Sequence, residues 1–164
     1  MDREGRRKFP QRPRRLTWLF DSVRPFYFVT FNTYRRRPIL ACKEVHEAFV
    51  DYCQRARSRD VAVGRYVVMP DHVHLFVAFS RDGMSLSDWV RILRRVLGKR
   101  LEELGETRPH WQEGFFDHVL RSADSYAQKW NYVRMNPVRA GLCAKPEGWD
   151  FQGEIVPELF DEKG

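Results

Sequence analysis

The order in which strand-like and helix-like segments alternate constrains the fold of this chain more than any other feature. Four segments are rich in aromatic and β-branched side chains and predict strands: residues 26–32, 63–69, 72–79 and 115–120. Only Pro70 and Asp71 separate the middle two, which indicates a hairpin with a tight turn. A chain with these strands can bury their apolar faces only against helices or another sheet.

Helical patterns fill the intervals between the strands. Apolar residues recur at helical spacing over Lys43–Arg57 and again from Leu86 to Leu104. Ser122 is a candidate N-cap for a third helix that runs toward Asn136 and Pro137, and the residues after Gly141 suggest a short irregular tail. The order β-α-β-β-α-β plus a final helix predicts an α+β fold of the ferredoxin-like split βαβ type. We expect an antiparallel sheet with helices on one face and the additional C-terminal helix carrying Tyr132.

The length of 164 residues suits one domain. We expect a basic N-terminal arm over residues 1–20, the folded domain over 21–142 and a C-terminal tail over 143–164. The net charge of +7 and the pI of about 9.6 indicate a polyanionic partner, although a solubilising tail would give the arm the same composition. No apolar run is long enough for a membrane span, and three widely spaced cysteines predict no disulfide framework, so a cytoplasmic location is expected.

The triplet His72-Val73-His74 opens the third predicted strand. Residues two apart on a strand point to the same face, so both imidazoles project together while Val73 enters the opposite face. Two adjacent imidazoles suit one divalent cation. A pair of histidines on a polar face without any ligand is the competing interpretation.

Tyr132 lies away from the apolar stripe of the last predicted helix, which consists of Ala123, Tyr126, Ala127, Trp130 and Val133. A tyrosine on the polar side of an amphipathic helix does not fill the core, although it can be an exposed aromatic with no role. Asn136 follows one turn later, where Pro137 limits the helix. Its amide oxygen suits either a helix cap or a hard cation.

Together these residues suit one kind of reaction at a phosphodiester. A phenol can attack a DNA phosphodiester to form a phosphotyrosine, and a cation held by two histidines and one amide can polarise the phosphate. The stretches Tyr66–Val77, Trp111–His118 and Tyr132–Leu142 resemble motifs of the single-tyrosine HUH transposases, and in particular of the REP-associated branch. The resemblance covers most of residues 25–142.

The resemblance implies specific roles. His72, His74 and Asn136 would bind Mg²⁺ or Mn²⁺, and Tyr132 would be the nucleophile that forms a 5′-phosphotyrosine. The substrate would be single-stranded DNA beside a REP hairpin, and the protein would act as a monomer, with a dimer as the alternative. Asp71 replaces the Asn of many relatives, a departure expected to leave the ligands untouched. His118 on the fourth predicted strand either supports a metal ligand or transfers a proton, or it is a half-buried strand histidine without such a role.

Other interpretations stay open at this point. Basic side chains on the second helix and in the arm either follow DNA phosphates or form solvated surfaces: Arg91, Arg95 and Lys99 on the helix, and Arg12, Arg14 and Arg15 in the arm. The first alternative function is a non-catalytic, domesticated nucleic-acid-binding protein on the same scaffold. The second is a metal nuclease that uses water as the nucleophile, and an RNA-binding protein is the third.

Overall fold

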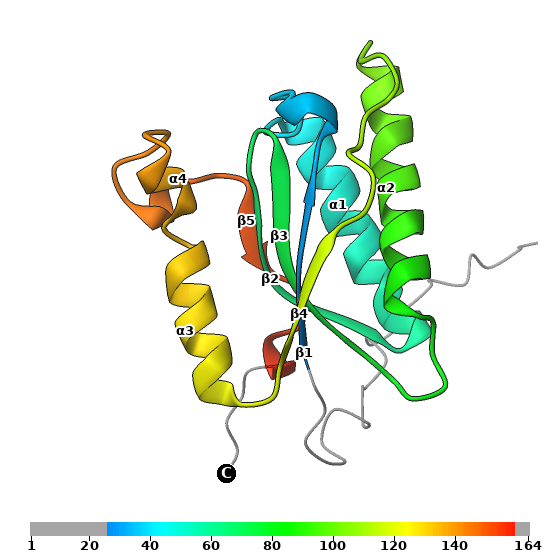
Figure 1. The fold of residues 1–164 in the computed structure, drawn as a ribbon, viewed down its shortest axis with the longest axis vertical. Coiled ribbons are helices and arrows are strands. Elements are labelled where there is room, and N and C mark those ends of the chain that lie inside the picture. The colour runs from blue at the N-terminus through cyan, green and yellow to red at the C-terminus, as the bar shows by residue number, and fades with distance from the viewer. Residues whose placement is uncertain (1–25, 160–164) are drawn as a thin grey trace, which may run out of the picture.

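The computed structural model describes residues 26–159, which form one antiparallel sheet with helices on both faces (Figure 1). The strands are β1 (Phe26–Asn32), β2 (Val61–Val68), β3 (His72–Phe79), β4 (Phe116–Leu120) and β5 (Gln152–Glu154). The helices are α1 (Lys43–Ala56), α2 (Leu86–Glu103), α3 (Ala123–Val133) and the short α4 (Asn136–Arg139). The strand order β4-β1-β3-β2 is that of the ferredoxin-like fold, so the predicted topology is confirmed, and β5 extends the sheet beyond β2.

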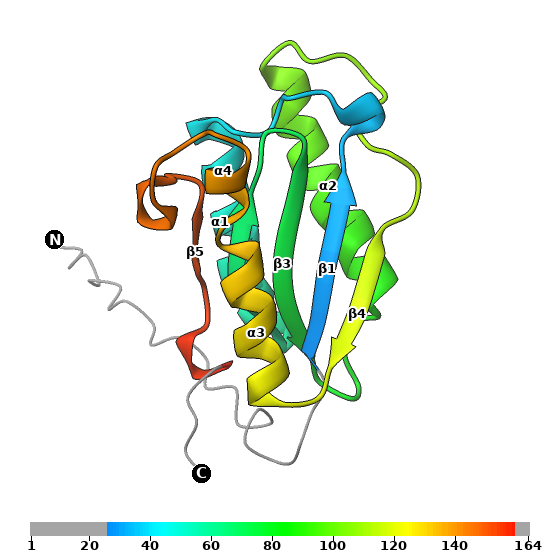
Figure 2. The same ribbon diagram turned by 60° about the vertical axis from the view of Figure 1, so that its left-hand side comes forward.

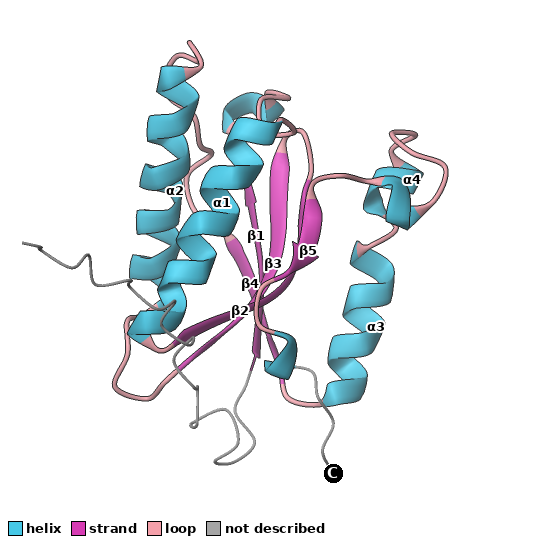
Figure 3. Cartoon of the chain, turned by 180° about the vertical axis from the view of Figure 1, so that it is seen from behind, coloured by secondary structure: helices cyan, strands magenta, loops and turns pink. Residues whose placement is uncertain are grey.

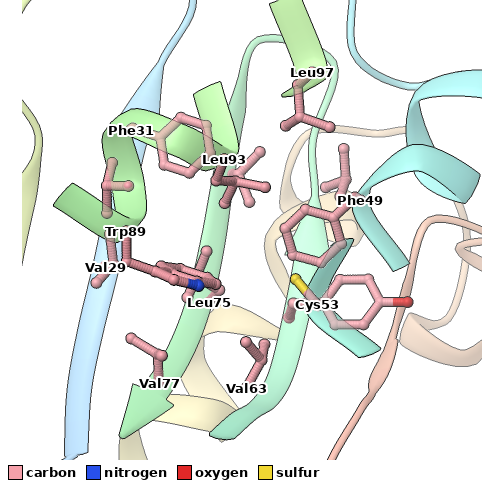
Figure 4. Packing of buried hydrophobic residues seen from close by; sticks show 14 of the residues in the cluster. Val29, Phe31, Phe49, Cys53, Val63, Leu75, Val77, Trp89, Leu93 and Leu97 are labelled. Atoms are coloured by element: carbon pink, nitrogen blue, oxygen red, sulfur yellow. The ribbon is translucent and has the colours of Figure 1, made fainter. Parts of the chain in front are cut away.

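Helices α1 and α2 cover one face of the sheet, which we call the core face, whereas α3 lies against the opposite face (Figure 3). Alternate residues of β1, β2 and β3 point into the core face and meet the apolar stripes of the two helices. Figure 4 shows Phe31, Leu75, Phe49, Trp89 and Leu93 packed together there. These side chains are fully buried, so the core face fixes the strands in place.

The segment after Gly141 corrects one prediction, because it is not an irregular tail throughout. Gln152–Glu154 pairs with β2 as an edge strand, and Val156 and Leu159 are buried against Ala62 and Ala78. Three residues of strand carry too little periodicity to be recognised in the sequence, and only the exposed edge of β2 makes them a strand. Among residues 26–159, no helix is long and apolar enough to cross a lipid bilayer.

The third helix begins as predicted but ends earlier. Ser122 is its N-cap, and the Ser122 hydroxyl accepts a hydrogen bond from the Ser125 amide at 3.1 Å. The helix ends at Val133, so Asn136 starts the separate helix α4, with Pro137 in its first turn. The predicted apolar stripe is also narrower than expected, because Tyr126 and Val133 are buried whereas Ala123 and Ala127 are exposed.

Candidate active site on the open face of the sheet

His72 and His74 project from β3 on the face opposite the core, and Val73 between them is fully buried in the core. We call this side the histidine face. Their Nε2 atoms lie 3.1 Å apart, so the two rings converge on one point. Antiparallel pairing places Thr30 and Asn32 of β1 directly opposite the two histidines. The strand geometry alone therefore brings the imidazoles together, as the spacing predicted.

Each histidine is oriented through its other ring nitrogen. His72 Nδ1 donates a hydrogen bond to Asp71 Oδ1 at 2.7 Å, since a carboxylate can only accept. His74 Nδ1 lies 2.7 Å from the Thr30 hydroxyl, which can donate or accept. The Nε2 lone pair of His72 therefore faces the space between the two rings. When the Thr30 hydroxyl accepts a hydrogen bond from His74 Nδ1, the Nε2 lone pair of His74 faces the same space.

Asp71 is therefore not a neutral departure from the family pattern, because it contacts a candidate ligand. Its carboxylate also accepts a hydrogen bond from Arg36 Nε at 2.9 Å, and Arg36 donates a second one to Asn32 Oδ1 at 2.6 Å. Burial opposes ionisation of Asp71, but the hydrogen bond from His72 and the charge of Arg36 outweigh it and lower the pKa of Asp71. The carboxylate stays charged and holds the His72 ring.

The backbone that presents Arg36 adopts an unusual conformation. Arg35 and Arg36 both have positive φ angles, 51° and 56°, in the left-handed region that non-glycine residues seldom occupy. Such residues persist where the surroundings hold them. The Arg36 side chain is held by Asp71 and Asn32, and its backbone amide donates a hydrogen bond to the Thr33 carbonyl at 3.1 Å.

Both histidines are kept neutral by their surroundings. Burial lowers the pKa of His72, although Asp71 partly offsets the effect. Burial lowers the pKa of His74 to about 3, and the positive charges of Lys129, Arg36 and Arg139 and the coupling to His72 contribute further. Neutral imidazole is the form that binds a cation. The donor set therefore fits a divalent ion.

Tyr132 and Asn136 meet through a third residue that the sequence did not single out. Tyr132 lies in the last turn of α3, and 64% of its side chain is exposed. The guanidinium of Arg139 lies 4.2 Å from the centre of the Tyr132 ring and donates a hydrogen bond to Asn136 Oδ1 at 2.6 Å. Arg139 is also close enough to His74 to lower its pKa. The charge of Arg139 thus acts on a residue of each motif, His74 of the histidine motif and Tyr132 of the tyrosine motif.

Within residues 26–159, no three His, Cys, Asp or Glu side chains are grouped so that they could hold a metal ion. An oxygen donor for a third ligand position would have to come from another residue type, and Asn136 is such a donor. His118 lies on β4, pairs in register with Phe28 and is exposed. Its role in supporting a metal ligand or transferring a proton stays a prediction, and its exposure does not match the half-buried strand histidine that was the alternative.

The basic side chains of α2 lie on the other side of the sheet from the histidines. Arg91, Arg95 and Lys99 line a groove of about 930 Å³ between α2 and residues 108–115. Arg94, which the sequence did not distinguish from its neighbours, crosses this groove, stacks over Phe31 at 5.3 Å and donates a hydrogen bond to the Gly114 carbonyl. Arg12, Arg14 and Arg15 of the predicted arm lie outside the described residues.

Comparison with known proteins places this geometry in a family. Residues 25–135 match the model of the IS200-like transposases, which is more than half of the chain. The chain belongs to the IS200-like transposase family. The members of this family are DNA-cleaving enzymes.

Individual relatives agree with that assignment. The chain is 25% identical over 126 residues to a REP-associated tyrosine transposase of Escherichia coli K12, covering 76% of this chain and 73% of the relative. A Haemophilus influenzae relative assigned to the same group is 24% identical over 132 residues, covering 73% of each chain. A solved structure of a REP-associated tyrosine transposase bound to a REP hairpin superposes with a TM-score of 0.62 at 23% identity, over 78% of this chain and 75% of that one.

Proposed function

We propose that this transposase nicks and joins single-stranded DNA beside REP-type hairpins, with Tyr132 as the nucleophile. The observation that carries the proposal is the position of Arg139. Its guanidinium contacts Tyr132 and Asn136, and its charge lowers the pKa of His74. A nucleophile must lie beside the groups that hold the scissile phosphate. The named partner of the solved relative, a REP hairpin, supports the same substrate class.

The protein's own groups perform the displacement in this proposal. The phenol oxygen of Tyr132 attacks the phosphorus, the bond to the 3′ oxygen breaks, and the leaving strand takes a proton to end in a 3′ hydroxyl. The DNA stays attached as a 5′-phosphotyrosine, and attack by another 3′ hydroxyl reverses the step. Bond energy is kept in the protein–DNA link, so joining needs no nucleotide cofactor.

His72, His74 and Asn136 would hold Mg²⁺ or Mn²⁺ in this scheme. The bound ion would polarise the scissile phosphate. Asp71 and Thr30 orient the two imidazoles, and Asn136 would exchange its Arg139 partner for the ion. The convergence of the two Nε2 atoms and the neutral state of both rings support this ligand set.

The DNA outside the reacting site would follow basic surfaces. The groove with Arg91, Arg95 and Lys99 is a candidate for the phosphates of the hairpin, together with Arg12, Arg14 and Arg15 of the arm. We propose that one protomer is sufficient for cleavage. The phosphate contacts predict a binding affinity that falls steeply as the salt concentration rises.

Covalent trapping tests the proposal. End-labelled single-stranded DNA that carries a REP-like hairpin is incubated with protein and Mg²⁺ or Mn²⁺, and the products are separated on a denaturing gel. The wild type should give a metal-dependent protein–DNA band, which Tyr132→Phe should lose while it keeps DNA binding within about two-fold. The matched control is Tyr27→Phe, because Tyr27 packs on the core face and should not be needed.

Each of the other outcomes would indicate a different function. Cleaved DNA without the covalent band would indicate a nuclease that uses water. Binding without cleavage on every hairpin would indicate a domesticated, non-catalytic binder. Preference for RNA over DNA of the same sequence would favour the RNA-binding interpretation.

A further inference from the structure

We propose that Phe116 is a stacking platform for one unpaired base of the single-stranded DNA, beside the reacting phosphate. The inference rests on the proposed function and specifies a subsite of it. Phe116 is on the edge strand β4, on the same face of the sheet as His72 and His74.

The first observation is the exposure of Phe116. Its side chain is 56% exposed, and its ring contacts Phe28 edge to face, with 6.4 Å between the ring centres and an angle of 69°. Other large apolar side chains of β1, β3 and β4 on this face are buried or half-buried under α3, for example Phe28 and Phe76. A phenylalanine with an open ring face is what a nucleobase stacks upon.

The second observation is the register of the sheet. Phe116 lies directly opposite Thr30 on β1, and Thr30 lies directly opposite His74 on β3. With strands about 4.8 Å apart, the Cα atoms of Phe116 and His74 are separated by roughly 10 Å. About 3.4 Å per stacked nucleotide, and more when the strand is extended, makes this a distance of one to three nucleotides.

The third observation is that Phe116 on β4 is exposed, whereas the two histidines on β3 are half-buried. Figure 2 shows α3 running past β5 and β3, with β1 and β4 to the side of it. Tyr126 and Trp130 of α3 contact Phe76, so the helix packs over the β3 part of the face. A single strand that reaches the histidines from the β4 side therefore passes Phe116 first.

Charge on this face favours a polyanion around the aromatic ring. Lys129 Nζ lies 4.9 Å from the centre of the Phe28 ring, which is the ring that Phe116 contacts. Asp117, the next residue along β4, pairs with Val29 and points to the core side instead. The cationic groove of α2 lies on that other side, so both sides of the edge strand offer contacts to one DNA molecule.

The test is a double-mutant cycle between protein and DNA. A REP-like hairpin with a single-stranded flank carries an abasic site at each flank position in turn, and binding is measured by fluorescence anisotropy in EDTA, so that no cleavage intervenes. For the wild type, one abasic position should weaken binding roughly ten-fold. Phe116→Ala should weaken binding to intact DNA by a similar factor and be insensitive to that abasic position, whereas Phe116→Trp should retain affinity and sensitivity.

The control variant is Leu104→Ala, an equally apolar side chain, 43% exposed, at the end of α2. It should leave the abasic profile unchanged. Equal abasic penalties in the wild type and in Phe116→Ala would overturn the proposal, and so would a Phe116→Ala effect confined to sedimentation or melting temperature. Covalent trapping without the coupling would refute the platform alone, whereas coupling without a covalent band would refute the nucleophile alone. If the wild-type protein binds none of these DNAs, both proposals are refuted.

Discussion

The two faces of the sheet use the same strands for opposite purposes. On the core face, Val29, Phe31 and Leu75 are fully buried under α1 and α2. On the histidine face, Thr30 and His74 occupy the intervening positions of the same two strands and form a polar cluster. Because side chains alternate along a strand, apolar packing on one face fixes the polar groups on the other.

The difference shows where rigidity comes from. The histidines are held by hydrogen bonds to Thr30 and Asp71 on strands that the core anchors. Tyr132 belongs to α3, which packs on the sheet through a smaller apolar cluster, and Asn136 belongs to the short helix α4 that follows. We therefore expect core substitutions to change stability, histidine-face substitutions to change chemistry, and the helix that carries the tyrosine to be the most adjustable part of the site.

The largest effect on stability should come from the core face. Phe49 is fully buried and its ring centre lies 4.6 Å from that of Tyr66, so Phe49→Ala should lower the free energy of unfolding by about 3–5 kcal/mol. Phe116→Ala, the matched change on the histidine face, should cost less than about 1 kcal/mol because the side chain is mostly exposed. Urea unfolding measures both, and equal losses would contradict the division between the faces.

His74→Ala should reverse this pattern. Covalent complex formation should fall by roughly 100-fold or more, since one of two histidine donors is removed. The matched change on the core side is His46→Ala, which removes a histidine whose Nε2 is hydrogen-bonded to the Tyr66 hydroxyl at 2.9 Å. It should lower stability but retain cleavage per folded molecule, measured as single-turnover rates at several Mn²⁺ concentrations. Retained cleavage in His74→Ala would remove it from the ligand set.

Acidification should destabilise the protein through the histidine face. The folded-state pKa of His74 is about 3 and its ordinary value is 6.5, so the unfolded chain binds the extra proton between these values. Stability contributed by neutral His74 is therefore lost as the pH falls below 6.5, by up to about 2 kcal/mol between pH 7 and pH 5. Urea unfolding in metal-free buffer should show a smaller pH effect in His74→Gln, and an identical effect in both proteins would argue against this origin.

The smallest of these effects should follow from Arg139→Met. The variant loses the contact with the Tyr132 ring, worth about 1 kcal/mol, so covalent complex formation should slow by about five-fold. Arg134→Met is the control, because Arg134 pairs with Glu147 at 2.7 Å instead. A similar slowing in both variants would show that any positive charge near α3 has the same effect.

Much of the fold was predictable from local patterns. The boundaries of β1 and β3, the N-cap at Ser122 and the direction of Val73 agree with the predictions, because periodicity and capping are properties of short segments. Strand β5 was missed, since its pairing depends on a free edge of β2 rather than on its own sequence. The end of α3 was misplaced because Pro137 can start a helix as well as stop one.

Within the candidate site, the sequence by itself determined the histidine pair and its shared face, because two residues of separation on a strand leave no other arrangement. It also determined that Tyr132 lies off the packed stripe of its helix. Only the tertiary structure decided which partners surround them. Thr30 and Phe116 reach the site through strand register, Arg36 through a left-handed turn, and Arg139 through its contact with the Tyr132 ring of α3. Such contacts join residues far apart in the chain, and no local pattern encodes them.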